Sequence, residues 1–182
     1  MAAADEALRG LPGEHAGICV DACHQAVQFE PAHRLRDLAA PIAKAQLSAA
    51  LRGTPAGLAP YVEPRFLHQT RTRTAGGVLG VDDLCQALAG GLPTEGEWRV
   101  HFHIPVHFNG PDTTQPELLE VMRELVGGPA PLTRHLEVET YTWQVLPAAQ
   151  RPRTDADLVE ALAAELAWTR DCLVDLGLKE MR

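Results

Sequence analysis

Three histidines occupy alternate positions in the segment HFHIPVH, residues 101–107, with hydrophobic side chains between them. Because side chains alternate across a β-strand, His101 and His103 are predicted to share one face of a strand and the hydrophobic residues the other. An imidazole in such a position can transfer protons near neutral pH or bind a metal ion. The pattern therefore predicts a functional face on an otherwise buried strand.

The same alternation occurs in other segments that have the composition of strands. In residues 42–48 and 135–141 every second side chain is polar, and those between are mostly apolar. A short run at 17–21 ends in Asp21, with His24 just beyond it. Besides the two histidines, the polar faces carry Lys44, Gln46, Ser48, Glu137, Glu139 and Tyr141. Each predicted strand thus has one apolar and one chemically active face.

Histidines and carboxylates on neighbouring strands are typical of a divalent metal site. Imidazole nitrogen and carboxylate oxygen are ligands of zinc and manganese. The alternative is a set of buried polar groups that satisfy one another through hydrogen bonds. Burying several titratable groups together is costly without an ion or a substrate, which favours the metal.

The elements that would position these residues alternate between strand and helix. Strands are predicted at 17–21, 42–48, 98–106 and 135–143, and helices at 31–40, 81–90, 113–128 and 154–177. Such alternation favours parallel strands, in chain order, with helical crossovers. Polar inner faces favour a parallel (βα) barrel of about four units, whose chemistry lies at the carboxyl ends of the strands. Residues 52–80 break the rhythm and are predicted as a loop and β-hairpin insertion turning at Gly76 and Gly77.

Composition limits the functional classes. A chain of 182 residues with 46% hydrophobic content predicts a single domain, residues 1–182. A net charge of -8 argues against a large nucleic-acid interface. The sequence has neither a signal peptide pattern nor an apolar run long enough to cross a bilayer, and its four cysteines lack paired spacing. We expect a cytoplasmic protein that handles a small molecule and does not insert into membranes.

Several long motifs resemble those of a known family. The segments GICVDACHQAVQFE, IAKAQLSAALR, FLHQ, WRVHFHIPV, TTQ and HLEVETYTWQVLP resemble the EboE family of metabolite traffic proteins, which are xylose isomerase-like TIM barrels. Family members are about twice as long as this chain. A full barrel needs eight βα units, and only about four are predicted here. The resemblance therefore implies the C-terminal half of such a barrel, with a homodimer or a missing N-terminal half-barrel as its partner.

The resemblance also implies roles for individual residues. The D-x-x-H of Asp21 and His24 resembles a metal-site segment, and Glu139 resembles a terminal glutamate ligand. With His103, these residues would bind zinc or manganese. Catalytic roles are expected for His101, Glu137 and Lys44, and substrate contacts for Gln46, His68 and Tyr141.

These roles imply metal-assisted chemistry on, or binding of, a small and perhaps prenylated metabolite, as in sugar isomerases and epimerases. One alternative is a protein that binds a metabolite or assists assembly without catalysis. Another is a metal-dependent nuclease that cleaves abasic DNA, which the acidic charge disfavours.

Overall fold

The computed structural model describes residues 16–181 and contains two β-sheets. One is parallel, with strand order β1-β2-β7, and the other is antiparallel, with order β3-β6-β4-β5. The parallel strands are β1 (Ile18–Asp21), β2 (Ile42–Leu47) and β7 (Leu136–Val138). The antiparallel strands are β3 (Ala49–Gly53), β4 (Thr70–Thr74), β5 (Gly77–Val81) and β6 (Trp98–Ile104).

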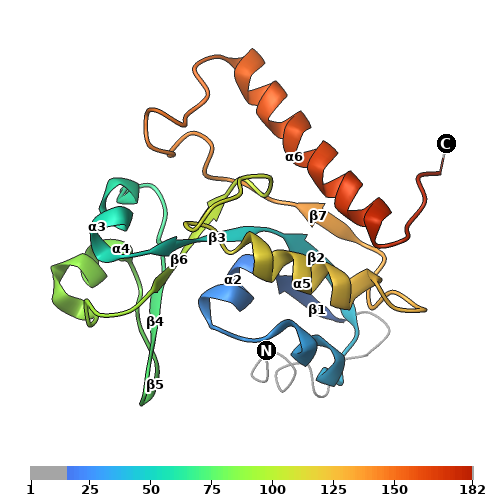
Figure 1. Ribbon diagram of the computed structural model, residues 1–182, viewed down its shortest axis with the longest axis horizontal. Coiled ribbons are helices and arrows are strands. Elements are labelled where there is room, and N and C mark those ends of the chain that lie inside the picture. Colours follow the sequence, from blue (N-terminus) through green and yellow to red (C-terminus); the bar gives the residue numbers. More distant parts are fainter. Residues whose placement is uncertain (1–15, 182) are drawn as a thin grey trace.

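A single extended segment joins the two sheets. Strand β2 leads through Ser48 directly into β3, so the chain leaves the parallel sheet and enters the antiparallel one without a turn (Figure 1). Strand β3 then pairs antiparallel with β6. This connection brings the carboxyl ends of β1 and β2 close to β6.

Helices cover the apolar face of the parallel sheet. The long helices are α5 (Gln115–Val126) and α6 (Asp155–Asp175), and the shorter ones near this sheet are α2 (Ala22–Val27) and η1 (Ala32–Asp37). The remaining helices belong to the core of the antiparallel sheet and are α3 (Pro55–Leu58), η2 (Ala59–Tyr61), α4 (Leu84–Gln86) and η3 (Ala87–Gly91). The core below α5 consists of residues such as Val20, Ala45, Leu47, Leu118 and Met122. The opposite face of this sheet keeps the polar residues.

A second core lies against β6. Trp98, Val100 and Phe102 are fully buried on one side of this strand, together with Leu58 and Leu84. The alternation that predicted an apolar and a polar face for residues 98–104 is therefore confirmed. It places His101 and His103 on the side away from this core.

The prediction of a parallel (βα) barrel, as the C-terminal half of a xylose isomerase-like TIM barrel, is wrong. The described residues form no closed barrel and no regular βα alternation. Strands β1, β2 and β7 are parallel, as predicted, but β6 does not stand between β2 and β7. The physical reason is that β2 continues into β3, whose antiparallel edge pairs with β6.

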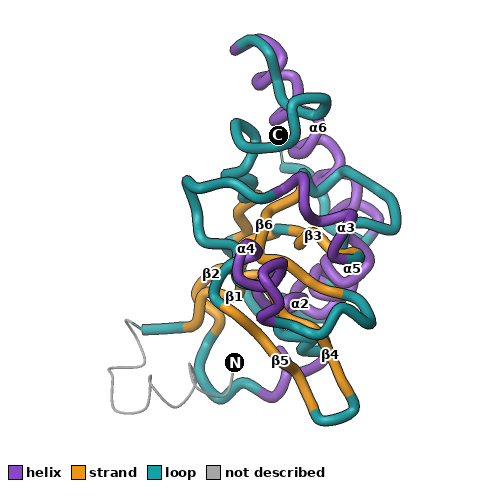
Figure 2. Tube along the Cα trace, turned by 90° about the vertical axis from the view of Figure 1, so that its left-hand side faces the viewer, coloured by secondary structure: helices purple, strands orange, loops and turns teal. Residues whose placement is uncertain are grey.

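The segment predicted as an insertion is part of the second sheet. Residues 70–81 form the β-hairpin that the sequence predicts, turning at Ala75 and Gly76 instead of Gly76 and Gly77. The hairpin pairs with β6 through β4 and projects from the body of the molecule (Figure 2). The predicted helices at 113–128 and 154–177 are confirmed as α5 and α6.

Within residues 16–181, no helix is long and apolar enough to cross a membrane. The predicted domain of residues 1–182 also includes 1–15 and 182, which lie outside the described residues.

Helix α6 is attached to the protein by a buried carboxylate. The buried residues of this helix are Glu165 and Thr169. The carboxylate of Glu165 accepts hydrogen bonds from Val106 N (2.9 Å), Thr140 Oγ1 (2.6 Å) and Trp143 Nε1 (2.9 Å). Three donors therefore depend on one side chain for their partners.

We expect Glu165→Gln to destabilise the protein by about 3 kcal/mol, because an amide leaves at least one of three buried donors facing another donor. Urea unfolding measures this change. The matched control is Glu160→Gln, which alters an exposed glutamate on the same helix and is expected to change stability by less than about 0.5 kcal/mol. Equal stability of the two variants would contradict this role of Glu165.

Candidate metal centre

Asp21 is held in place by its own helix and by the junction between the sheets. It caps α2, and its Oδ1 accepts hydrogen bonds from Cys23 N (2.9 Å) and His24 N (3.3 Å). Ser48, between β2 and β3, donates its hydroxyl to the same oxygen at 2.6 Å. An oxygen with three donors has a fixed position. The other oxygen, Oδ2, is left to face the site.

Three imidazoles surround Oδ2 of Asp21. The distances from this oxygen are 3.2 Å to His101 Nε2, 3.6 Å to His24 Nδ1 and 3.9 Å to His103 Nε2. Ligand atoms about 2.0 to 2.1 Å from a tetrahedral zinc ion are about 3.3 Å apart. The measured distances are thus close to those of a zinc site, and small side-chain movements would complete it.

His103 presents a free lone pair to this site. Its Nδ1 donates to the backbone oxygen of Glu139 at 2.8 Å, so the proton of a neutral ring is on Nδ1 and Nε2 is unprotonated. Nε2 is buried and has no hydrogen-bond partner among the described residues. Burial lowers the pKa of His103 to about 4, so the ring is neutral at pH 7. A backbone carbonyl bound to the far nitrogen is typical of a histidine that ligates a metal.

Asp21 and the histidines around it form a cluster in which each group affects the pKa of its neighbours. Burial by itself would raise the pKa of Asp21, but hydrogen bonds with His101, His24 and Ser48 hold it well below its usual value. The hydrogen bond with Asp21 raises the pKa of His24. Asp21 is therefore ionised, and cations are attracted to the space beside it.

Cys23 also lies close enough to contribute a ligand. The ligand atoms of Asp21, Cys23, His101 and His103 all lie within 4.8 Å of one another. However, burial raises the pKa of the Cys23 thiol well above its usual value. The residue packs with Ala26, Val27 and Ala50. The thiol of Cys23 is therefore better explained as part of the packed core.

Two predicted ligands, His24 and Glu139, are not among the four residues whose ligand atoms lie within 4.8 Å of one another. The half-exposed His24 faces Oδ2 of Asp21 and donates Nε2 to Gln69 Oε1 at 3.2 Å. The carboxylate of Glu139 accepts a hydrogen bond from Gln46 Nε2 at 2.5 Å. Its burial and the nearby charge of Asp21 raise the pKa of Glu139. Glu139 thus reaches the cluster by its backbone oxygen, which binds His103.

The predicted catalytic residues separate into two groups. His101 belongs to the cluster, with its Nε2 3.2 Å from Asp21 Oδ2. Lys44 and Glu137 form an ion pair of 2.5 Å between β2 and β7, with about 40% of each side chain exposed (37% and 41%). They share the polar face of the parallel sheet with Gln46 but lie outside the cluster.

The other predicted substrate residues support the histidine strand. His68 is fully buried, and its ring nitrogens contact the backbone oxygen of His101 (3.0 Å) and Glu63 Oε1 (2.7 Å). Tyr141 packs its ring against His103, with centroids 4.6 Å apart, and its hydroxyl lies 3.4 Å from the same His101 oxygen. Both residues therefore position β6 and its histidines.

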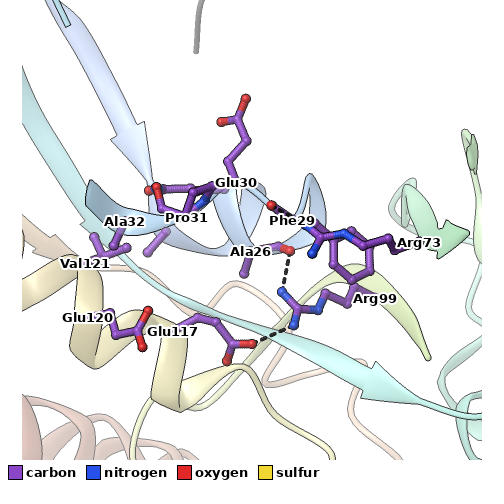
Figure 3. Close-up of a pocket in the computed structure, with 12 residues that line it drawn as sticks. Ala26, Phe29, Glu30, Pro31, Ala32, Arg73, Arg99, Glu117, Glu120 and Val121 are labelled. Carbon is purple, nitrogen blue, oxygen red and sulfur yellow. Dashed lines mark hydrogen bonds and ion pairs between the residues drawn. The ribbon is translucent and has the colours of Figure 1, made fainter. Parts of the chain in front are cut away.

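Arg99 holds β6 against the helix that carries Asp21. It donates to the backbone oxygen of Ala26 at 2.9 Å and to Glu117 at 2.7 Å, as Figure 3 shows. Its guanidinium also stacks on Phe29, 4.3 Å from the ring centroid. These contacts join α2, α5 and β6, and so fix the separation between Asp21 and the two histidines of β6.

A pocket borders the cluster at Asp21 and His24. It has a volume of about 210 Å³ and is lined by Asp21, His24, Gln25, Gln28 and Glu30, together with β1 residues Ile18, Cys19 and Val20. Since an apolar cavity of about 150 Å³ holds benzene, this pocket has room for a molecule of about eight heavy atoms. A small metabolite could reach Asp21 and His24 by this route.

Sequence reasoning missed Ser48 and Gln69 as partners of the cluster. Ser48 was placed on the polar face of its strand by alternation, but its hydrogen bond with Asp21 depends on the β2 to β3 junction. Gln69 precedes β4, and only the pairing of β4 with β6 brings it near His24. No local pattern indicates either contact.

The low pKa of His103 predicts an acid-sensitive contribution to stability in metal-free protein. The unfolded chain takes up this proton near pH 6.5, and the folded protein only near pH 4. The free energy of unfolding should therefore fall as the pH is lowered between these values, by up to about 1.4 kcal/mol per pH unit from this group. Urea unfolding with a chelator present should show a shallower slope for His103→Gln. Equal slopes would contradict the assignment of a neutral, buried His103.

The chain matches no protein-family model, curated protein or solved structure.

Proposed function

We propose that this protein binds one divalent metal ion, with zinc as the best fit, between Asp21, His101 and His103. The observation that carries this proposal is the buried Nε2 of His103, which has no partner among the described residues and faces a carboxylate oxygen that His101 and His24 also face. A buried polar atom without a partner is costly. A metal ion would satisfy it and would neutralise the charge of Asp21.

The bound ion would contact an oxygen atom of a small metabolite. Three protein ligands with an open fourth position are typical of catalytic zinc, which polarises a substrate oxygen. The pocket beside Asp21 and His24 supplies the space for such a molecule. We therefore propose metal-assisted binding of, or chemistry on, a small metabolite with a hydroxyl or carbonyl oxygen. The resemblance of the motifs to the EboE family supports a metabolite ligand, although the chain does not form the barrel of that family.

Two side chains are placed to handle protons beside the metal. His24 is half exposed, faces the pocket, and has a pKa raised by its hydrogen bond with Asp21. Glu139 has a pKa raised by burial and by the charge of Asp21. Each can hold a proton near neutral pH more readily than a free side chain of its type. His24 is the better candidate because it lines the pocket itself.

We expect wild-type protein to bind one zinc ion per chain, measured by competition with a chromophoric chelator. Loss of a residue that supports a metal ligand typically weakens metal binding about 10- to 100-fold. We expect a larger loss of zinc affinity when a ligand itself is replaced, in the variants Asp21→Asn, His101→Gln and His103→Gln. The matched control is Lys44→Gln, which removes a charge from the same sheet face outside the cluster. Circular dichroism verifies that each variant folds. Unchanged affinity in folded His103→Gln would contradict the proposal.

An open coordination position can be tested with manganese. We expect Mn²⁺-loaded protein to enhance water proton relaxation, because at least one water occupies the open position. Saturating amounts of a small hydroxy-carbonyl compound such as glycolaldehyde should reduce this enhancement by displacing the water. A bound ion without relaxation enhancement would show a closed structural site and would contradict a metabolite at the metal.

A further inference from the structure

Away from the metal centre, a crevice lies between α6 and the parallel sheet. It has a volume of about 340 Å³. One wall consists of side chains from β2 and β7, including Leu47 and Val138, and the other of α6 and the residues after it, including Leu173 and Leu178. Seven of its eleven lining residues are Leu or Val. The crevice is thus an apolar space with two walls, at the low end of the size range of ligand pockets.

Several apolar side chains of this crevice are open to solvent. Leu166 and Val174 on α6 are 59% and 49% exposed, and Leu178 is 37% exposed. Exposed apolar area of this kind is energetically unfavourable. A hydrocarbon chain in the crevice would cover it. Since a cavity of about 150 Å³ holds benzene, the volume admits about a dozen carbon atoms.

The polar residues of the lining indicate a charged head group. Arg170 and Lys179 contribute two positive charges and Glu180 one negative charge, so the lining is positive in a chain of net charge -8. Arg170 is bonded to Asp171 at 2.8 and 3.0 Å, whereas Lys179 makes no ion pair within residues 16–181. The Lys179 ammonium is therefore available to an anion.

A buried hydroxyl in the wall lacks a partner. Thr169 is 5% exposed, lines the crevice, and its Oγ1 has no hydrogen-bond partner among the described residues. A buried hydroxyl without a partner is energetically unfavourable. A ligand with an oxygen acceptor would satisfy it. Together with Lys179, this observation favours an oxyanion at the end of the hydrocarbon chain.

We propose that the crevice between α6 and β7 binds a linear aliphatic carboxylate of about twelve carbon atoms. This site is separate from the metal centre, and its occupation does not depend on the proposed metal function.

The test is calorimetric titration of the full chain with dodecanoate and dodecanol below their aggregation limits. Wild-type protein should bind one dodecanoate saturably. Val174→Trp fills the crevice from an exposed position and should weaken binding about tenfold or more. The matched control, Val159→Trp, changes a 65% exposed residue of α6 outside the crevice and should bind as wild type does. Lys179→Gln should weaken the binding of dodecanoate two- to fivefold, which is the scale of an exposed ion pair, and should leave the binding of dodecanol unchanged.

Three results would overturn this proposal. The first is the absence of saturable dodecanoate binding. The second is equal binding by Val174→Trp and Val159→Trp. The third is a dimer in sedimentation that Val174→Trp dissociates, since a second copy would then be the occupant. Zinc affinity, measured on the same variants, should stay at the wild-type value, so failure here is distinguishable from failure of the metal site.

Discussion

The carboxylate of Asp21 is the contact on which the arrangement of the two sheets around the site depends. One oxygen is fixed by Ser48 and by the start of α2, so it joins β1 to the junction of β2 and β3. The other faces His101 and His103 of β6, which belongs to the second sheet. An ionised group in this position needs cationic or hydrogen-bonding partners. The same electrostatic requirement that draws the histidines of β6 toward β1 also favours a metal ion between them.

The faces of the strands could be predicted from the sequence, whereas their partners could not. Alternation is a local property, so the polar side of residues 98–104 and the apolar side against the second core were evident from the side chains alone. The pairing of β6 depends on Ser48, where the chain continues straight from one sheet into the next. An antiparallel sheet with one polar face has the same alternation as a barrel strand. For this reason the pattern was compatible with a barrel that the chain does not form.

For the candidate site, most of the residues could be predicted from the sequence, but their contacts could not. The D-x-x-H segment and the histidine strand supplied Asp21, His24, His101 and His103, which the structure brings together. Their separate roles depend on rotamers and backbone contacts. The prediction for Glu139 named its carboxylate, but it is the backbone oxygen of this residue that orients His103. His68 has both ring nitrogens engaged away from Asp21, because β4 and β6 lie side by side.

X-ray absorption spectroscopy of the zinc-loaded protein tests the metal centre most directly, because it identifies the atoms bound to the ion. We predict a shell of nitrogen and oxygen ligands at about 2.0 to 2.1 Å, with the multiple scattering of two imidazole rings and no sulfur at about 2.3 Å. In His103→Gln the signal of one imidazole should disappear. A sulfur ligand would contradict the protonated, packed Cys23, and a shell of oxygens without imidazole would contradict the metal centre as a whole.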